Sequence, residues 1–283
     1  MTVDSIETAT TTPDLVAGPL LELCEVRAAY DAITVLHGID LSVVGGQVVA
    51  LLGPNGAGKT TTLQVAAGVH PVASGQLRLG GRDMTGADPR DLARAGVCLI
   101  PEGRGVFPNL SVRDNLLMMT FTGRSREEIQ EIAFTRFPIL GKRADQTAGT
   151  MSGGEQQMLA LARGLATDPA VLMLDELSMG LAPLVVAQLY EQVAEIARQG
   201  VAVLVVEQFA AAVLDIADHA AVLVRGRIEK QGHPDSIRDE LAALYLGSSE
   251  RPKHARTASS ANSTRPRSPT PRPVGPCCGC APE

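Results

Sequence analysis

Short runs of apolar residues, each ended by polar residues or glycine, recur along the chain. Three of them contain no polar residue at all: Val48–Leu52, Ala170–Leu174 and Val201–Val206. Such runs are typical of strands that are buried on both faces of a parallel sheet. The strand pattern disappears from Ser111 to Thr167, where only helical signals remain. The sequence therefore predicts an α/β fold with a helical insertion.

Weaker signals predict further elements around these strands. Strands are expected at Leu21–Val26, Val35–Val43, Gln76–Leu79 and Val97–Ile100, and a hairpin around Gly226 in Val222–Ile228. Helices are expected at Arg90–Ala95, after the Asp88-Pro89 start signal, and at Leu184–Arg198. Within the helical insertion the spacing S-x-x-[DE] marks three helix starts: Ser111 with Asp114, Ser125 with Glu128 and Ser152 with Glu155.

The two ends of the chain differ in composition from its middle. Residues 1–18 are rich in Thr and Asp and predict a flexible segment, and 248–283 are rich in Ser, Pro, Thr and Arg and predict a disordered tail. One folded domain is expected at 19–247, with its helical subdomain at about 104–168. The tail contains Cys277, Cys278 and Cys280, but no fourth ligand is spaced nearby as in a zinc motif, which favours an exposed tail.

Charge and hydropathy exclude several classes of protein. The net charge is −6, and the tail holds six Lys and Arg against two Glu, so the rest carries about −10. An acidic body argues against broad nucleic-acid binding. No Lys or Arg precedes Arg27, unlike in a signal peptide, and no apolar run approaches the roughly 18 residues of a membrane span. We therefore expect a cytosolic protein.

A glycine-rich loop follows the first apolar run and precedes a segment compatible with a helix. It fits the pattern G-x-x-x-x-G-K-[ST], in which backbone N–H groups surround phosphate oxygens at a helix start. Lys59 would reach the terminal phosphates and Thr60 would ligate Mg²⁺. An ordinary Gly-rich turn is the alternative, but the flanking elements favour a nucleotide site. Its candidate residues are Gly53, Pro54, Asn55, Gly56, Ala57, Gly58, Lys59, Thr60 and Thr61.

Polar residues also end three of the other predicted strands. Asp175 and Glu176 are either a solvated acid pair or, behind a phosphate loop, the groups that hold Mg²⁺ through water and orient an attacking water. Gln208 ends the strand at Val201–Val206, and Glu102 follows the one at Val97–Ile100, where a solvated loop acid is the alternative. Tyr30, between the first two strands, either stacks on a base or packs in the fold.

The helix start at Ser152 differs from the other two because two glycines follow it. A capped helix explains Ser152 and Glu155, but Gly153 and Gly154 carry a cost in helix propensity. Close approach to an anion at the positive helix end explains the glycines.

Three motifs together resemble the nucleotide-binding subunit of an ABC transporter over about Leu20 to Gly247. They are the loop at Gly53–Thr61, Met151-Ser152-Gly153-Gly154-Glu155-Gln156-Gln157, and Val171-Leu172-Met173-Leu174-Asp175-Glu176. The resemblance implies a P-loop ATPase core with an antiparallel β subdomain and a helical subdomain. It also implies a head-to-tail dimer that encloses two ATPs, Tyr30 on adenine, Asp175 at Mg²⁺, and Glu176 as catalytic base. Ser152, Gly153, Gly154 and Glu155 would contact the ATP of the partner chain.

Within that family the chain resembles an ATPase subunit of branched-chain amino acid importers. The likeness lies in Ile100–Pro108, Gly180-Leu181-Ala182-Pro183 and Val206-Glu207-Gln208, with Glu102 in place of the usual glutamine and Gln208 in place of the switch histidine. It implies a second ATPase subunit, two permease subunits, indirectly a solute-binding protein, and a place on the inner face of the membrane. Leu177 and Ala182 depart from the usual proline and aspartate. A transporter for urea or lipopolysaccharide, and a soluble ABC ATPase, are the alternatives.

Overall fold

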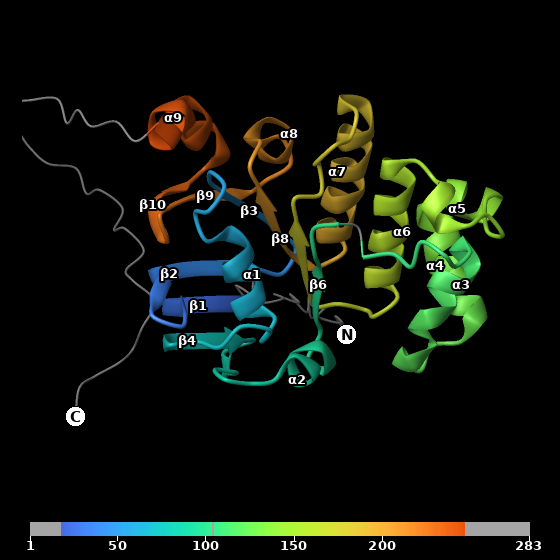
Figure 1. Ribbon diagram of the computed structural model, residues 1–283, viewed down its shortest axis with the longest axis horizontal. Helices are drawn as coiled ribbons and strands as arrows, with labels where there is room; N and C mark the ends of the chain where they lie inside the picture. Colours follow the sequence, from blue (N-terminus) through green and yellow to red (C-terminus); the bar gives the residue numbers. More distant parts are fainter. Residues whose placement is uncertain (1–17, 104, 247–283) are drawn as a thin grey trace, which may run out of the picture.

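The computed structural model describes residues 18–103 and 105–246. A four-stranded antiparallel sheet lies at the lower left in Figure 1, in the order β2-β1-β4-β5. Its strands are β1 (Pro19–Tyr30), β2 (Ile33–Val44), β4 (Ser74–Leu79) and β5 (Arg82–Asp83).

A six-stranded sheet forms the centre of the molecule, in the order β10-β9-β3-β8-β7-β6. Neighbouring strands are parallel except at the β9–β10 hairpin. The strands are β3 (Val48–Leu52), β6 (Val97–Ile100), β7 (Val171–Asp175), β8 (Ala202–Glu207), β9 (His219–Val224) and β10 (Arg227–Gly232).

The all-apolar strands are buried on both faces, and their alternate residues enter two different cores. In β3, Val48, Ala50 and Leu52 pack against the helices on one side, whereas Val49 and Leu51 face the antiparallel sheet. Because successive side chains of a strand point to opposite faces, a polar residue would be buried at either position. This explains why these strands show no hydrophobic alternation.

Helices cover the sheets and form the insertion, which lies to one side in Figure 1. Helix α1 (Lys59–Ala66) packs between the two sheets. The insertion consists of α3 (Val112–Leu117), η1 (Met118–Thr122), α4 (Arg126–Arg136), α5 (Pro138–Lys142), η2 (Ala148–Thr150) and α6 (Gly153–Leu165). The remaining helices are α2 (Pro89–Arg94), α7 (Pro183–Arg198), α8 (Ala210–Leu214) and α9 (Pro234–Leu246).

The structure confirms the predicted fold class and most of the predicted elements. The bounds of β3 and β6 are as predicted, and the side chains of Ser111, Ser125 and Ser152 each accept a hydrogen bond at the start of their helix. Strands β1 and β2 are longer than predicted, and α8 and α9 were not predicted. The proposed segment boundaries stay predictions, and the tail with its three cysteines lies outside the described residues.

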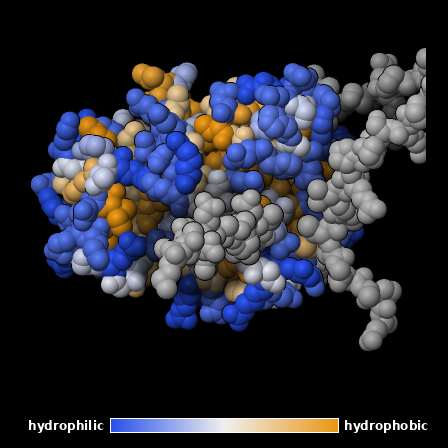
Figure 2. All heavy atoms as spheres, turned by 180° about the vertical axis from the view of Figure 1, so that it is seen from behind, coloured by the Kyte–Doolittle hydropathy of each residue, from blue (hydrophilic) through white to orange (hydrophobic). Residues whose placement is uncertain are grey.

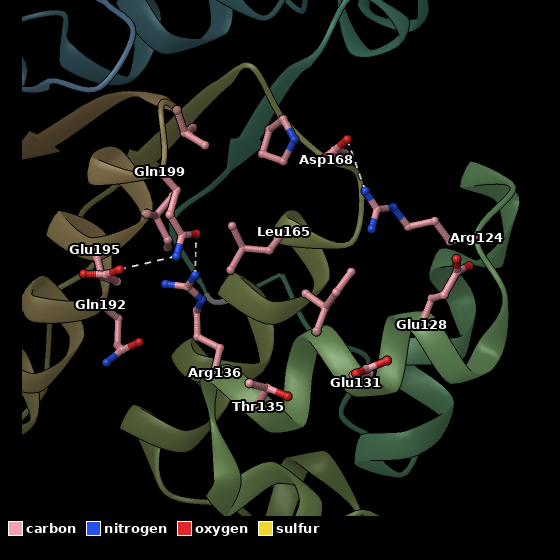
Figure 3. Close-up of a pocket in the computed structure, with 14 residues that line it drawn as sticks. Arg124, Glu128, Glu131, Thr135, Arg136, Leu165, Asp168, Gln192, Glu195 and Gln199 are labelled. Atoms are coloured by element: carbon pink, nitrogen blue, oxygen red, sulfur yellow. Dashed lines mark hydrogen bonds and ion pairs between the residues drawn. The ribbon is translucent and has the colours of Figure 1, made fainter.

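Two polar contacts join the helical insertion to the turns that precede β7 and β8. Arg124 pairs with Asp168 at 3.1 Å, and Arg136 donates a 2.6 Å hydrogen bond to Gln199 at the end of α7 (Figure 3). A cavity of 810 Å³ lies between these contacts and is lined by α4, α7 and the residues that precede β7 and β8. It lies at the amino ends of these strands, so it is separate from the edge where Asp175 and Glu207 end them.

Hydrophilic side chains dominate the face shown in Figure 2, and apolar ones occur there in small groups. None of the helices that the structure describes is both long enough and apolar enough to span a bilayer.

Candidate nucleotide site

The loop between β3 and α1 depends on two glycines. Gly58, immediately before α1, has φ +105°, and a Cβ there would lie 2.8 Å from Leu36 Cδ2. A Cβ on Gly53 would lie 2.3 Å from the carbonyl oxygen of Leu223. Because Gly58 has no side chain, it makes no side-chain cap on α1, and the first N–H groups of the helix lack an intrahelical partner. The helix start is therefore open to an anion.

Lys59 holds a positive charge inside this loop. Its Nζ donates to the carbonyl oxygens of Gly53, at 2.9 Å, and Pro54, at 3.3 Å, and lies 3.6 Å from Glu176 Oε1. The side chain is only 5% exposed. The ammonium group thus lies between the glycine-rich loop and Glu176, which follows β7. A phosphate bound beside Lys59 would contact the loop and lie near Glu176.

Asp175 ends β7 beside the start of α1. Its carboxylate is hydrogen-bonded by the Thr60 side chain, but among the residues that the structure describes its buried Oδ1 has no hydrogen-bond partner. Burial raises the pKa of Asp175, the neighbouring Glu176 and Glu102 raise it further, and the Thr60 bond opposes this. A buried oxygen without a donor is a group that a bound cation would satisfy.

Glu176 occupies a strained backbone position. Its φ is +48°, in the left-handed region that residues other than glycine rarely adopt. Its N–H donates to Val206 O at 2.9 Å. Because β7 and β8 are parallel neighbours, Gln208 follows β8 at the same sheet edge. Glu176 and the exposed Glu102 line one cavity of 320 Å³.

Tyr30 is the last residue of β1, and its ring packs against a neighbouring side chain. Its ring stacks on His70, with 4.2 Å between ring centroids, and its hydroxyl donates to Gln64 Oε1 at 2.7 Å. The side chain nevertheless remains 43% exposed. The contacts to His70 and Gln64 hold the ring in place beside α1, with surface left for a ligand.

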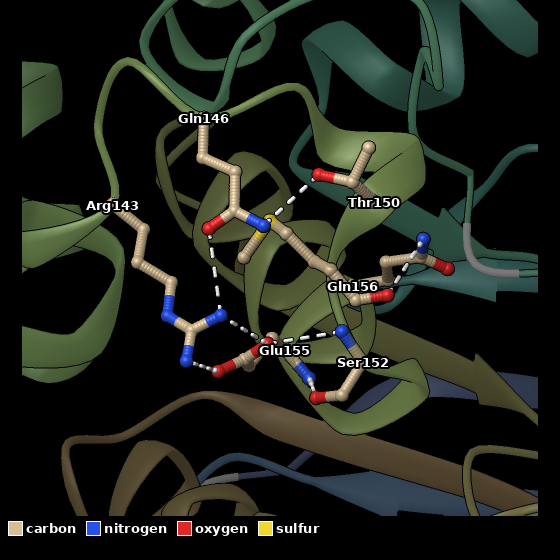
Figure 4. Close-up of polar contacts among 7 residues, drawn as sticks. Arg143, Gln146, Thr150, Ser152, Glu155 and Gln156 are labelled. Carbon is tan, nitrogen blue, oxygen red and sulfur yellow. Dashed lines mark hydrogen bonds and ion pairs between the residues drawn. The ribbon is translucent and has the colours of Figure 1, made fainter.

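The start of α6 is a complete capping box (Figure 4). Ser152 Oγ accepts from Glu155 N at 3.4 Å, and Glu155 Oε2 accepts from Ser152 N at 3.0 Å. Arg143 pairs with both carboxylate oxygens of Glu155, at 3.1 and 3.2 Å, and with Gln146. A Cβ on Gly154 would lie 2.3 Å from Val185 Cγ1 of α7. Close packing against Val185 thus also explains why a glycine is required at position 154, which the sequence did not predict.

Residues 36–178 match the ABC transporter family. The chain is 42% identical over 211 residues to the high-affinity branched-chain amino acid transport ATP-binding protein BraG of Pseudomonas aeruginosa, covering 74% of this chain and 91% of BraG. This chain belongs to the ABC transporter family. It is also 34% identical to the probable branched-chain amino acid transport ATP-binding protein LivF of Archaeoglobus fulgidus, over 81% of this chain and 99% of LivF.

The fold of this ABC subunit is that of known cassettes. The ADP conformation of MJ1267, an ATP-binding cassette of an ABC transporter, superposes with a TM-score of 0.73 at 24% identity, covering 81% of this chain and 99% of MJ1267. Membership of the family makes the chain an ATPase subunit, as the resemblance of its three motifs implied.

The structure brings one group of the predicted residues together. Lys59 with Glu176, and Thr60 with Asp175, meet where β3 and β7 end. No hydrogen bond or ion pair among the described residues links the α6 capping box to this group. The departures from the family pattern lie nearby: Leu177 is buried, and Ala182 precedes α7 without a side-chain cap.

Sequence analysis missed several residues that shape this site. Arg143 and His70 contact predicted site residues across 12 and 40 positions of sequence, and Tyr190 bonds Glu207 across 17. Such pairs follow no local spacing. Only Glu207 carried a signal, as an acid that directly follows a fully apolar run.

Proposed function

We propose that this chain is the ATP-hydrolysing subunit of an importer for branched-chain amino acids. The grouping of Lys59, Thr60, Asp175 and Glu176 at one sheet edge carries the hydrolytic part of the proposal. The transported solute rests on the names of BraG and LivF and on the subgroup motifs of the sequence.

ATP binds at the open start of α1. The phosphates lie against backbone N–H groups of the Gly53–Thr61 loop, where the helix dipole and the Lys59 ammonium favour negative charge. Adenine stacks on the exposed part of Tyr30, opposite its contact with His70. Lys59 exchanges its loop carbonyls for phosphate oxygens, and so neutralises charge that grows as the terminal phosphoryl group leaves.

Thr60 and Asp175 fit a Mg²⁺ ion that accompanies ATP. The hydroxyl and the unpartnered carboxylate oxygen are hard oxygen ligands of the kind this cation prefers, with Asp175 acting through water. When bound, the ion offsets phosphate charge. Glu102 lines the adjoining cavity and contacts the nucleotide from there.

Glu176 orients the attacking water and accepts its proton. Its carboxylate is held near Lys59, and its strained backbone fixes the direction of the side chain. Gln208 donates to the terminal phosphate from the neighbouring strand end. As a neutral amide it does not titrate, unlike histidine.

The decisive experiment replaces Glu176 with Gln. The amide cannot accept a proton, so ATP binding should persist while turnover falls by about a thousandfold. Gln208→Ala should lower turnover less, with ATP affinity nearly unchanged. Glu191→Gln, an exposed isosteric change on α7, is the control. Steady-state hydrolysis at the native rate in Glu176→Gln would refute the assignment.

A second cassette completes the site. Ser152, Gly153, Gly154 and Glu155 contact the terminal phosphate of the partner chain's ATP, since no described contact joins them to this chain's own phosphate loop. Two permease subunits dock on the segment around Glu102 to Leu117, of whose described residues only those of α3 (Val112–Leu117) are helical and in which Phe107 is 43% exposed. This places the chain on the inner face of the membrane, and a solute-binding protein acts through the permeases.

Copurification tests the solute. The tagged chain should retain two permease subunits in detergent, and proteoliposomes of that complex with its binding protein should take up labelled leucine when ATP is enclosed. Uptake of urea, or coupling to lipopolysaccharide, with no uptake of leucine would contradict the amino acid assignment.

A further inference from the structure

Glu207 is a buried carboxylate next to the site that no step of the reaction above uses. It ends β8, immediately before Gln208, and is only 1% exposed. Burying a carboxylate is costly unless donors surround it. Glu207 Oε1 accepts two hydrogen bonds, from Ser178 N at 2.9 Å and from the Tyr190 hydroxyl at 2.6 Å.

The two donors come from different elements. Ser178 lies two residues after Glu176, in the same turn, and Tyr190 lies on α7 with 2% exposure. Burial, and then the charge of Glu207, raise the pKa of the Tyr190 hydroxyl, so it stays a proton donor. The carboxylate therefore joins the Glu176 turn to α7 at one point.

The preceding residue of β8 holds the same turn at a second point. Val206 O accepts from Glu176 N at 2.9 Å. Val206 and Glu207 thus fix the turn on both sides of Leu177, which is itself buried, and Gln208 directly follows the end of the strand. A turn with φ +48° needs such support, because its backbone conformation is unfavourable for a residue with a side chain.

We propose that Glu207 is a positioning residue that fixes the Glu176 carboxylate relative to Lys59 and Gln208. The proposal rests on the proposed role of Glu176. What matters is an acceptor at the position of Oε1, where the Ser178 and Tyr190 donors converge. Without it the buried Tyr190 hydroxyl and the half-buried Ser178 N–H lose their partner, and the turn relaxes.

The test compares four variants of the full chain: Glu207→Ala, Glu207→Gln, Tyr190→Phe, and Glu191→Gln as an exposed control on α7. Turnover, KM for ATP and nucleotide affinity are measured, the last by titration. Each rate is divided by the concentration of protein that binds nucleotide, so that misfolded protein does not lower it. Glu207→Ala should lower kcat by about 100-fold, the cost of a small misplacement of a catalytic group, with affinity within threefold of native. Tyr190→Phe removes one bond to the carboxylate, leaves those from Ser178, and should lower kcat by about tenfold.

Glu207→Gln tests whether kcat depends on a hydrogen-bond acceptor at this position. Its amide oxygen can accept both bonds, so kcat should recover to within about threefold of native. Native kcat in Glu207→Ala, or an equal loss of kcat and nucleotide affinity, would overturn the proposal. Loss in Glu207→Gln as large as in Glu207→Ala would also overturn it. If Glu207→Ala does not fold, Tyr190→Phe and Glu207→Gln decide alone.

A double-variant cycle separates this proposal from the function it rests on. In the Glu176→Gln background, Tyr190→Phe should change residual turnover by less than twofold, because no catalytic base is left to position. A full tenfold further loss would contradict the positioning role. Native turnover in Glu176→Gln alone would instead contradict the role of Glu176.

Discussion

The starts of α1 and α6 have the same dipole but differ in what meets their first N–H groups. Gly58 provides no side-chain cap for α1, and the first turn of α1 contains no acidic residue. Ser152 and Glu155 cap α6 with a hydroxyl and a carboxylate, and Arg143 pairs with that carboxylate. The first N–H groups of α1 need a ligand to satisfy them. The start of α6 is already capped by the chain's own side chains, so a ligand there would bind in addition to the caps.

This difference fits the two proposed roles. A site that holds its own nucleotide gains most from unsatisfied donors and a cation within the loop, as at Lys59. A site that meets a phosphate on another chain must keep its shape while that chain is away. The capping box and the Arg143 pair supply that preformed shape at α6.

Lys59→Ala should produce the largest effect on ATP binding to the isolated chain, because it acts on the open start. Removing a buried charge-assisted donor to phosphate should weaken ATP binding by about 10- to 100-fold in the isolated chain, measured by nucleotide titration. Lys142→Ala, an exposed lysine at the end of α5, is the matched control. Unchanged affinity in Lys59→Ala would show that α1 is not the nucleotide site.

Ser152→Arg acts on the preformed start and should separate the two sites. The side chain would fill the place of the partner's phosphate, so ATP-dependent association on size exclusion and hydrolysis should be lost. Nucleotide binding to the monomer through Lys59 should survive. If the monomer instead fails to bind nucleotide, the α6 start serves the chain's own site or its folding.

The sequence predicted elements and caps better than it predicted the reasons for single residues. The α6 start was found from Ser152 and Glu155 because capping follows a local spacing. Its glycines were assigned to an anion alone, because Val185 lies 31 positions from Gly154 and no local pattern shows that contact. Arg143 was not predicted for the same reason, and the sequence showed Glu207 only as an acid at a strand end, because the partners of both residues are set by packing between elements.

Gly154→Ala distinguishes packing from anion approach at α6. The new Cβ collides with Val185 and should destabilise the fold by about 1 to 3 kcal/mol, measured by thermal unfolding. Adding Val185→Ala makes room and should restore stability. If association with the partner then also returns, the glycine is needed for packing. Stable protein that still fails to associate would show that close approach of the phosphate requires it.

Arg143→Ala should produce the smallest effect and the sharpest comparison. The Arg143–Glu155 pair is partly exposed, so its loss should cost at most about 1 kcal/mol of stability. It would, however, leave the Glu155 charge uncompensated within one turn of the proposed phosphate position, and ATP-dependent association should weaken several-fold. Adding Glu155→Gln removes that charge while its amide oxygen keeps the bond from Ser152 N, so association should return.

Arg113→Ala, which breaks the exposed Arg113–Asp145 pair on the same insertion, controls for loss of an arginine. If the double variant stays as weak as Arg143→Ala, then Arg143 acts through structure rather than charge, and the α6 start does not meet a phosphate in the way that its difference from α1 implies.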